Sequence, residues 1–94
     1  MTLQEGLELM KQEENAVLLD VRSEEEYNGG HVVGSINVPL NRLATFSVPK
    51  DKKIFVYCQS GQRATRAVKV LQSLGYDALN IGGVAGYPGN LQLS

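Results

Sequence analysis

Residues 53–74 read KIFVYCQSGQRATRAVKVLQSL and are the most informative part of the sequence about its fold. Residues 53–57 start with a charged side chain and continue as an uninterrupted apolar and aromatic run, which is typical of a strand buried on both faces. From residue 62 to residue 74, apolar side chains recur at helical spacing along one face. Gly75 follows, where a glycine commonly ends a helix. The stretch therefore predicts a buried strand, a tight loop and an amphipathic helix.

The rest of the chain also alternates helices with strands. Thr2 with Glu5 and Ser23 with Glu26 have the spacing of capping boxes, which mark helix starts. The expected helices cover residues 3–13, a short segment after Ser23 that stops at residues 28–30, and residues 40–46. The expected strands cover residues 16–21, 35–38 and 78–81. This pattern predicts an α/β domain whose central, mainly parallel sheet of about four to five short strands has helices on both faces.

Composition narrows the class of protein. A chain of 94 residues with 43% apolar and 20% charged side chains fits one globular domain, residues 1–94. Its net charge of -1 argues against nucleic-acid binding, and no apolar run is long enough to span a membrane. The first residues lack the basic and apolar regions of a secretory signal. A cytoplasmic location is therefore expected, and a mature exported domain stays an alternative.

Cys58 is the only cysteine of the chain. It has no disulfide partner, and with one histidine and scattered carboxylates beside it no metal site is expected. A lone cysteine is commonly a small buried apolar residue, but Cys58 follows the strand 53–57 directly. Ligands of parallel α/β sheets bind beyond the carboxyl ends of the strands. Cys58 therefore lies where this architecture places its chemistry.

The loop after Cys58 predicts an anion site. It consists of Gln59, Ser60, Gly61 and Gln62, and Arg63 follows. A tight loop that closes on a helix start turns several unpaired backbone N–H groups toward one point, and Gly61 permits the required positive φ. These groups, the helix dipole and the Arg63 guanidinium favour the thiolate of Cys58 over the thiol. The alternative is that Cys58 and Arg63 only end a strand and begin a helix.

Four motifs occur along the chain in order. They are Asp20-Val21-Arg22 with Glu26-Tyr27, GHVVGSINVP at residues 30–39, Cys58 with Arg63 five positions later, and Asn80-Ile81-Gly82-Gly83. Together they resemble the motifs of the rhodanese family over roughly residues 3–87. Tyr87 stands where that family usually has tryptophan. Pro88 follows it and resists helix continuation, so a shortened closing helix is expected.

The resemblance implies a sulfurtransferase with a catalytic cysteine, Cys58. Its thiolate attacks the outer sulfur of a donor such as thiosulfate, sulfite leaves, and loop N–H groups hold the persulfide. Cyanide or a thiol then takes the sulfur, which gives ping-pong kinetics. No cofactor is implied. Because the chain has no second cysteine, the acceptor is external, either a small molecule or a thiol-bearing protein.

The resemblance also suggests roles for individual residues. The expected substrate-binding residues are Gln59, Ser60, Gly61, Gln62 and Arg63. Asp20, Arg22 and His31 are expected to give structural support rather than to react. Asp20 is expected to position Arg22 or the active-site loop, and His31 to bond the backbone of its own turn before the next strand. Arg66, one turn after Arg63, either extends the positive field or is a solvated helix residue. The uncharged side chains between Cys58 and Arg63 suggest modest use of thiosulfate, or a different donor.

Two other functions are compatible with such a fold. One is a non-catalytic binding or sensing module, and many such modules lack the cysteine that this chain retains. The other is a phosphatase or arsenate reductase, whose loop has one more residue between cysteine and arginine. Six residues run from Cys58 to Arg63 inclusive, and this shorter loop favours a sulfur atom over a tetrahedral oxyanion.

Overall fold

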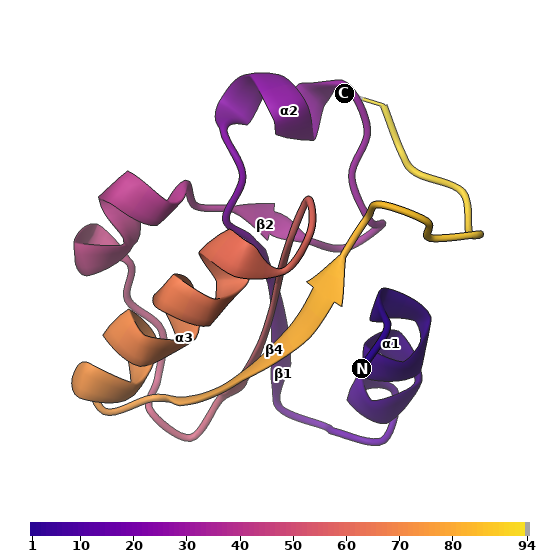
Figure 1. The fold of residues 1–94 in the computed structure, drawn as a ribbon. Helices are drawn as coiled ribbons and strands as arrows, with labels where there is room; N and C mark the ends of the chain where they lie inside the picture. The colour runs from indigo at the N-terminus through magenta and orange to yellow at the C-terminus, as the bar shows by residue number, and fades with distance from the viewer. Residues whose placement is uncertain (94) are drawn as a thin grey trace.

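The computed structural model describes residues 1–93 and is built around a four-stranded parallel sheet. The strands are β1 (Ala16–Asp20), β2 (Ile36–Asn37), β3 (Lys53–Cys58) and β4 (Asp77–Gly83), in the order β2-β1-β3-β4. The register places Asp20 of β1 beside Tyr57 of β3, so the carboxyl ends of the two central strands meet at one edge. Figure 1 shows α3 starting beyond this edge.

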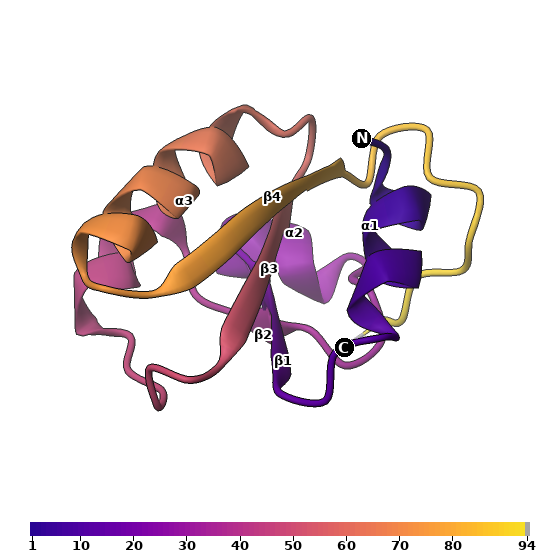
Figure 2. The same ribbon diagram turned by 90° about the horizontal axis from the view of Figure 1, so that it is seen from below.

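Helices cover both faces of the sheet. They are α1 (Leu3–Met10), α2 (Glu24–Asn28), the 3-10 helix η1 (Leu40–Thr45) and α3 (Gln62–Ser73). Figure 2 shows α3 on one face of the sheet and α1 on the other. The α/β architecture that the sequence predicts is therefore confirmed, with four strands. Within residues 1–93, every helix is too short or too polar to cross a bilayer.

The central strand β3 divides the core into two apolar clusters. Ile54, Val56 and Cys58 pack toward α3, whereas Phe55 and Tyr57 pack toward α1, and all five are at most 1% exposed. The other buried members on the α3 face are Leu19, Val21, Leu43, Ala64, Ala67, Leu71, Tyr76 and Ala78. Those on the α1 face are Leu3, Leu18, Val32 and Ile81. Burial of both faces explains why β3 is apolar without alternation.

Several element boundaries differ from the predicted ones. The first helix ends at Met10 instead of residue 13, because the polar residues that follow offer no apolar side chain to bury. Residues 40–45 form a 3-10 helix, and the strand expected at 35–38 pairs only over Ile36–Asn37. The last strand continues to Gly83, because its two glycines allow close approach of the N-terminal residues at Gly82 and of the loop after β3 at Gly83, instead of ending the strand.

The segment after β4 contains no helix within the described residues. Tyr87 closes a turn onto Val84 and packs against the cluster on the α1 face. The chain then returns to the start of the segment before β2, where the backbone of Gln92 exchanges two hydrogen bonds with that of His31, at 2.9 and 2.7 Å. The closing helix is therefore absent rather than shortened, and an antiparallel bridge to His31 holds the chain end.

Replacing Gly6 with alanine tests the contact between α1 and β4. The added Cβ atom would collide with Ile81 close to its backbone, so the helix would have to move. We expect Gly6→Ala to lower the free energy of unfolding by about 1–3 kcal/mol, although alanine favours helices. Gly29→Ala is the control, because its Cβ would meet only ordinary contacts. Equal stability of the two variants in denaturant unfolding would contradict this packing.

Candidate active site

The Cys58 sulfur lies at the junction of β3 and α3. Its residue is 1% exposed, and Sγ accepts hydrogen bonds from the backbone N–H groups of Gly61, at 3.0 Å, and Ala64, at 3.4 Å. Gly61 has a φ of 96° and is the residue before α3, so the left-handed turn there is the feature that only glycine adopts readily. Cys58 is buried in the core on one side, and backbone amides face its sulfur on the other.

Further N–H groups of the loop are available to a ligand. Within residues 1–93, the backbone N–H groups of Gln59, Ser60, Gln62 and Arg63 have no hydrogen-bond acceptor. The last two belong to the first turn of α3, where a helix leaves its own donors unbonded. The side chains of Gln59 and Ser60 are exposed. Of the predicted loop residues, Gly61 donates to the sulfur through its backbone, and Ala64 is a second donor that the sequence did not indicate.

Residues at the end of β4 and just after it hold the loop that follows Cys58 in place. The carbonyl groups of Cys58 and Gln59 accept hydrogen bonds from the amides of Val84 and Ala85, both at 3.0 Å. A Cβ atom on Gly83 would collide with the Gln59 carbonyl group, which explains the glycine at that position. The Asn80 side-chain amide donates to the Gly61 carbonyl at 3.0 Å. The motif at residues 80–83 therefore positions the loop.

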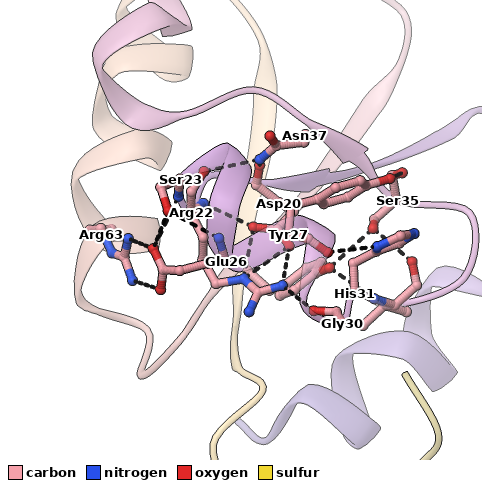
Figure 3. Close-up of polar contacts among 12 residues, drawn as sticks. Asp20, Arg22, Ser23, Glu26, Tyr27, Gly30, His31, Ser35, Asn37 and Arg63 are labelled. Carbon is pink, nitrogen blue, oxygen red and sulfur yellow. Dashed lines mark hydrogen bonds and ion pairs between the residues drawn. The ribbon is translucent and has the colours of Figure 1, made fainter. Parts of the chain in front are cut away.

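Arg63 points toward α2. Its Nη1 and Nη2 atoms lie 2.6 and 2.9 Å from the two carboxylate oxygens of Glu26, and each side chain is about one-third exposed. Figure 3 shows this fork between α3 and α2. Glu26 Oε1 also accepts hydrogen bonds from the backbone and hydroxyl of Ser23. The capping box explains Glu26 by its neighbours in the chain, so no local pattern points to its second partner, Arg63.

The ionisation of Glu26 follows from these contacts. Hydrogen bonds from the Arg63 guanidinium lower the pKa of Glu26 to about 2, and those from Ser23 act in the same direction. Glu26 in turn raises the pKa of Arg63. Both side chains are therefore charged at every pH near neutrality.

A buried ion pair joins the two residues predicted to support the loop. Asp20 is fully buried and Arg22 is 4% exposed, and Arg22 Nε and Nη2 lie 2.7–3.1 Å from the Asp20 carboxylate oxygens. Arg22 Nη2 also donates to the Gly30 carbonyl, at 2.6 Å. The Asn37 side chain donates to the carbonyl groups of both Asp20 and Arg22. This network joins the ends of β1 and β2 to the segment at residue 30 (Figure 3).

The segment before β2 folds around Tyr57. The Tyr57 hydroxyl accepts a hydrogen bond from the Val32 amide and shares one with the Ser35 hydroxyl, both at 3.0 Å. Burial raises the pKa of Tyr57, against the opposing effect of these bonds. The His31 side chain contacts Tyr27: its Nδ1 lies 2.9 Å from the Tyr27 carbonyl, and the two rings stack with their centroids 3.7 Å apart. These contacts are typical of a histidine with a structural role.

Two hollows flank the ion pair of Arg63 and Glu26. The larger, of about 640 Å³, is lined among others by Glu25, Glu26, Gln59 and Leu91. The smaller, of about 290 Å³, is lined among others by Ser23, Leu40 and Arg63. Arg66 lies exposed on α3 and makes no ion pair within residues 1–93. Among those residues, no three His, Cys, Asp or Glu side chains lie close enough together to hold a metal ion.

Comparison with known proteins shows to which family this chain is similar. The family description "Rhodanese-like domain" matches residues 2–87. The chain belongs to the rhodanese family. The adenylyltransferase and sulfurtransferase uba4 of Ogataea parapolymorpha is 46% identical over 63 residues, which are 64% of this chain and 16% of that protein. This rhodanese domain therefore spans a small part of that relative.

Two further relatives are similar in length. The thiosulfate sulfurtransferase PspE of Escherichia coli is 38% identical over 71 residues, covering 70% of this chain and 68% of that protein. A solved structure of an Escherichia coli rhodanese with anions is 31% identical with a TM-score of 0.74, covering 84% of this chain and 99% of that one. These relatives support sulfurtransferase-type chemistry for this rhodanese.

Replacing Asp20 with asparagine tests the buried ion pair. The substitution preserves the shape of the side chain but leaves the Arg22 charge buried without a counterion. We expect the free energy of unfolding to fall by about 3–5 kcal/mol. The control is Glu8→Gln, which removes an exposed ion pair with Lys11 and should cost less than about 1 kcal/mol. Similar losses for the two variants in denaturant unfolding would show that Arg22 is solvated.

The low pKa of Glu26 predicts a pH-dependent contribution to stability. Because folding lowers this pKa from 4.5 to about 2, the charged pair stabilises the fold above about pH 5, and its contribution is lost as the pH falls toward 2. The stability difference between the wild type and Glu26→Gln should therefore shrink over this range in unfolding measurements. Glu25→Gln is the control, and its stability difference from the wild type should change much less with pH. If the stability difference for Glu26→Gln were as independent of pH as that for Glu25→Gln, the ion pair would be contradicted.

Proposed function

We propose that this rhodanese is a sulfurtransferase that carries sulfane sulfur on Cys58 as a persulfide. The observation that carries the proposal is the pair of backbone N–H groups, from Gly61 and Ala64, that donate to Cys58 Sγ. Backbone donors at a helix N-terminus stabilise a thiolate, which is the nucleophilic form of cysteine. The remaining unpaired loop amides offer donors for a second, negatively charged sulfur.

The first half-reaction transfers one sulfur atom to the protein. An electron pair of the Cys58 thiolate forms a bond to the outer sulfur of thiosulfate. The sulfur–sulfur bond of the donor breaks at the same time, and its electron pair leaves with sulfite. The product is a Cys58 persulfide whose terminal sulfur carries the negative charge that the donor sulfur had. Charge is conserved without proton transfer, so the step requires no general base.

The second half-reaction removes the sulfur to an external acceptor. Cyanide attacks the terminal sulfur and leaves as thiocyanate, which restores the Cys58 thiolate, and a small thiol or a thiol-bearing protein would take the sulfur in the same way. Cys58 is the only cysteine of the chain, so no internal thiol competes for the persulfide. A covalent intermediate formed with one substrate and discharged by another gives ping-pong kinetics.

The contacts of Cys58 favour this reaction over the two alternatives. A binding module has no need for amides directed at a cysteine sulfur, and those contacts are present here. A phosphatase needs room for a tetrahedral oxyanion around its cysteine. In this loop, Gly61 and Ala64 lie within hydrogen-bond distance of the sulfur itself, which suits a smaller occupant.

Mass measurement on the intact protein tests the proposal. We expect the protein to gain one sulfur atom when it is incubated with thiosulfate or an organic thiosulfonate, and to lose it to cyanide with release of thiocyanate. The matched control is Cys58→Ser, which should gain nothing. A wild-type mass that stays unchanged with every donor would contradict the proposal and favour a binding module.

A further inference from the structure

The ion pair of Glu26 and Arg63 has a consequence for the choice of sulfur donor. We propose that Glu26 is a specificity-determining residue: its carboxylate occupies the Arg63 guanidinium, so that Cys58 takes sulfur more readily from donors that carry less negative charge than thiosulfate. This inference rests on the sulfur transfer proposed above. It concerns which donor the same site prefers.

The first argument is the geometry of the pair. Two parallel contacts, at 2.6 and 2.9 Å, join both terminal nitrogens of Arg63 to both carboxylate oxygens of Glu26. This is the bidentate arrangement by which arginine also binds oxyanions such as phosphate. An oxyanion donor can use this edge of Arg63 only by displacing Glu26, which is a competing anion within the same protein chain.

The second argument is that Glu26 is anchored. Its Oε1 atom accepts hydrogen bonds from the Ser23 backbone, at 3.1 Å, and from the Ser23 hydroxyl, at 3.0 Å. These contacts form the capping box of α2. Moving the carboxylate away from Arg63 would break the capping box as well as the ion pair, so the carboxylate is a stronger competitor than a side chain held by Arg63 alone.

The third argument is the shortage of other positive charge. Gln59, Ser60 and Gln62 are uncharged. The Arg22 guanidinium, which also lines the larger hollow, is bound to buried Asp20. Glu25 lines the same hollow and adds negative charge. A dianion that enters this hollow therefore meets the carboxylates of Glu25 and Glu26 and one cation, Arg22, whose charge is already compensated. Repulsion of this kind disfavours the more highly charged donor.

Two donors that differ by one charge provide the probe. Thiosulfate is a dianion, and methanethiosulfonate is a monoanion with a methyl group in place of one oxygen. In each case the Cys58 thiolate bonds to the outer sulfur while the donor's sulfur–sulfur bond breaks. The leaving group takes the electron pair, as sulfite from the first donor and as methanesulfinate from the second. The ratio of their kcat/KM values therefore reports how the site responds to donor charge.

The decisive variant is Glu26→Gln. Glutamine keeps an oxygen that can accept the Ser23 hydrogen bonds, so α2 retains its cap while Arg63 loses its anionic partner. We expect the kcat/KM ratio of thiosulfate to methanethiosulfonate to rise on the order of tenfold, mainly through a lower KM for thiosulfate. Glu25→Gln removes the same charge from the same hollow without releasing Arg63, and it should change the ratio much less.

A double-mutant cycle with Arg63→Gln assigns the effect to the pair. If Glu26 acts through Arg63, adding Glu26→Gln to Arg63→Gln should change the ratio no more than Glu25→Gln does. An unchanged ratio in Glu26→Gln, or an equal rise in Glu25→Gln, would overturn the inference while leaving the sulfurtransferase intact. Failure of wild-type protein to gain sulfur from either donor would instead reject the proposed function, and this inference with it.

Discussion

The proposed chemistry rests on the two hydrogen bonds that the amides of Gly61 and Ala64 donate to the Cys58 sulfur. They require β3 to end at Cys58, the chain to reverse at a left-handed glycine, and α3 to begin at once. A strand buried on both faces is rigid, and a helix packed along the same sheet cannot shift independently. The amides are therefore positioned by the fold itself, as pre-organised donors that need no rearrangement when charge develops on sulfur.

Two ion pairs near this loop have different physical roles. The pair of Asp20 and Arg22 is almost fully buried. Arg22 also donates to the Gly30 carbonyl, and the Asn37 side chain donates to the backbone carbonyl groups of Asp20 and Arg22. Such a pair is costly to break and ties neighbouring segments together. The pair of Arg63 and Glu26 is about one-third exposed and flanked by two hollows. It lies where a substrate anion can compete for the arginine.

The hydrogen bonds of the scaffold converge on buried polar groups rather than on the reactive sulfur. Tyr57 directly precedes Cys58, and its hydroxyl is hydrogen-bonded to Val32 and Ser35. His31 is bonded to Tyr27 through its side chain and to Gln92 through its backbone. These contacts fix the segment before β2 against the central strand. As a result, the contacts of Tyr57 and His31 serve the architecture, and the proposed chemistry relies on backbone donors instead.

The alternation of strands and helices, the two capping boxes and the position of Cys58 after a buried strand could all be predicted from the amino-acid sequence. These features are local, because hydrophobic periodicity and cap residues act within a few positions. The contact of Arg63 with Glu26, 37 positions away, and the pairing of Gln92 with His31 became evident only in the folded chain. Such contacts depend on the order of strands in the sheet. The capping box with Ser23 is a sufficient local reason for a glutamate at position 26. The sequence pattern therefore does not reveal that Glu26 also pairs with Arg63.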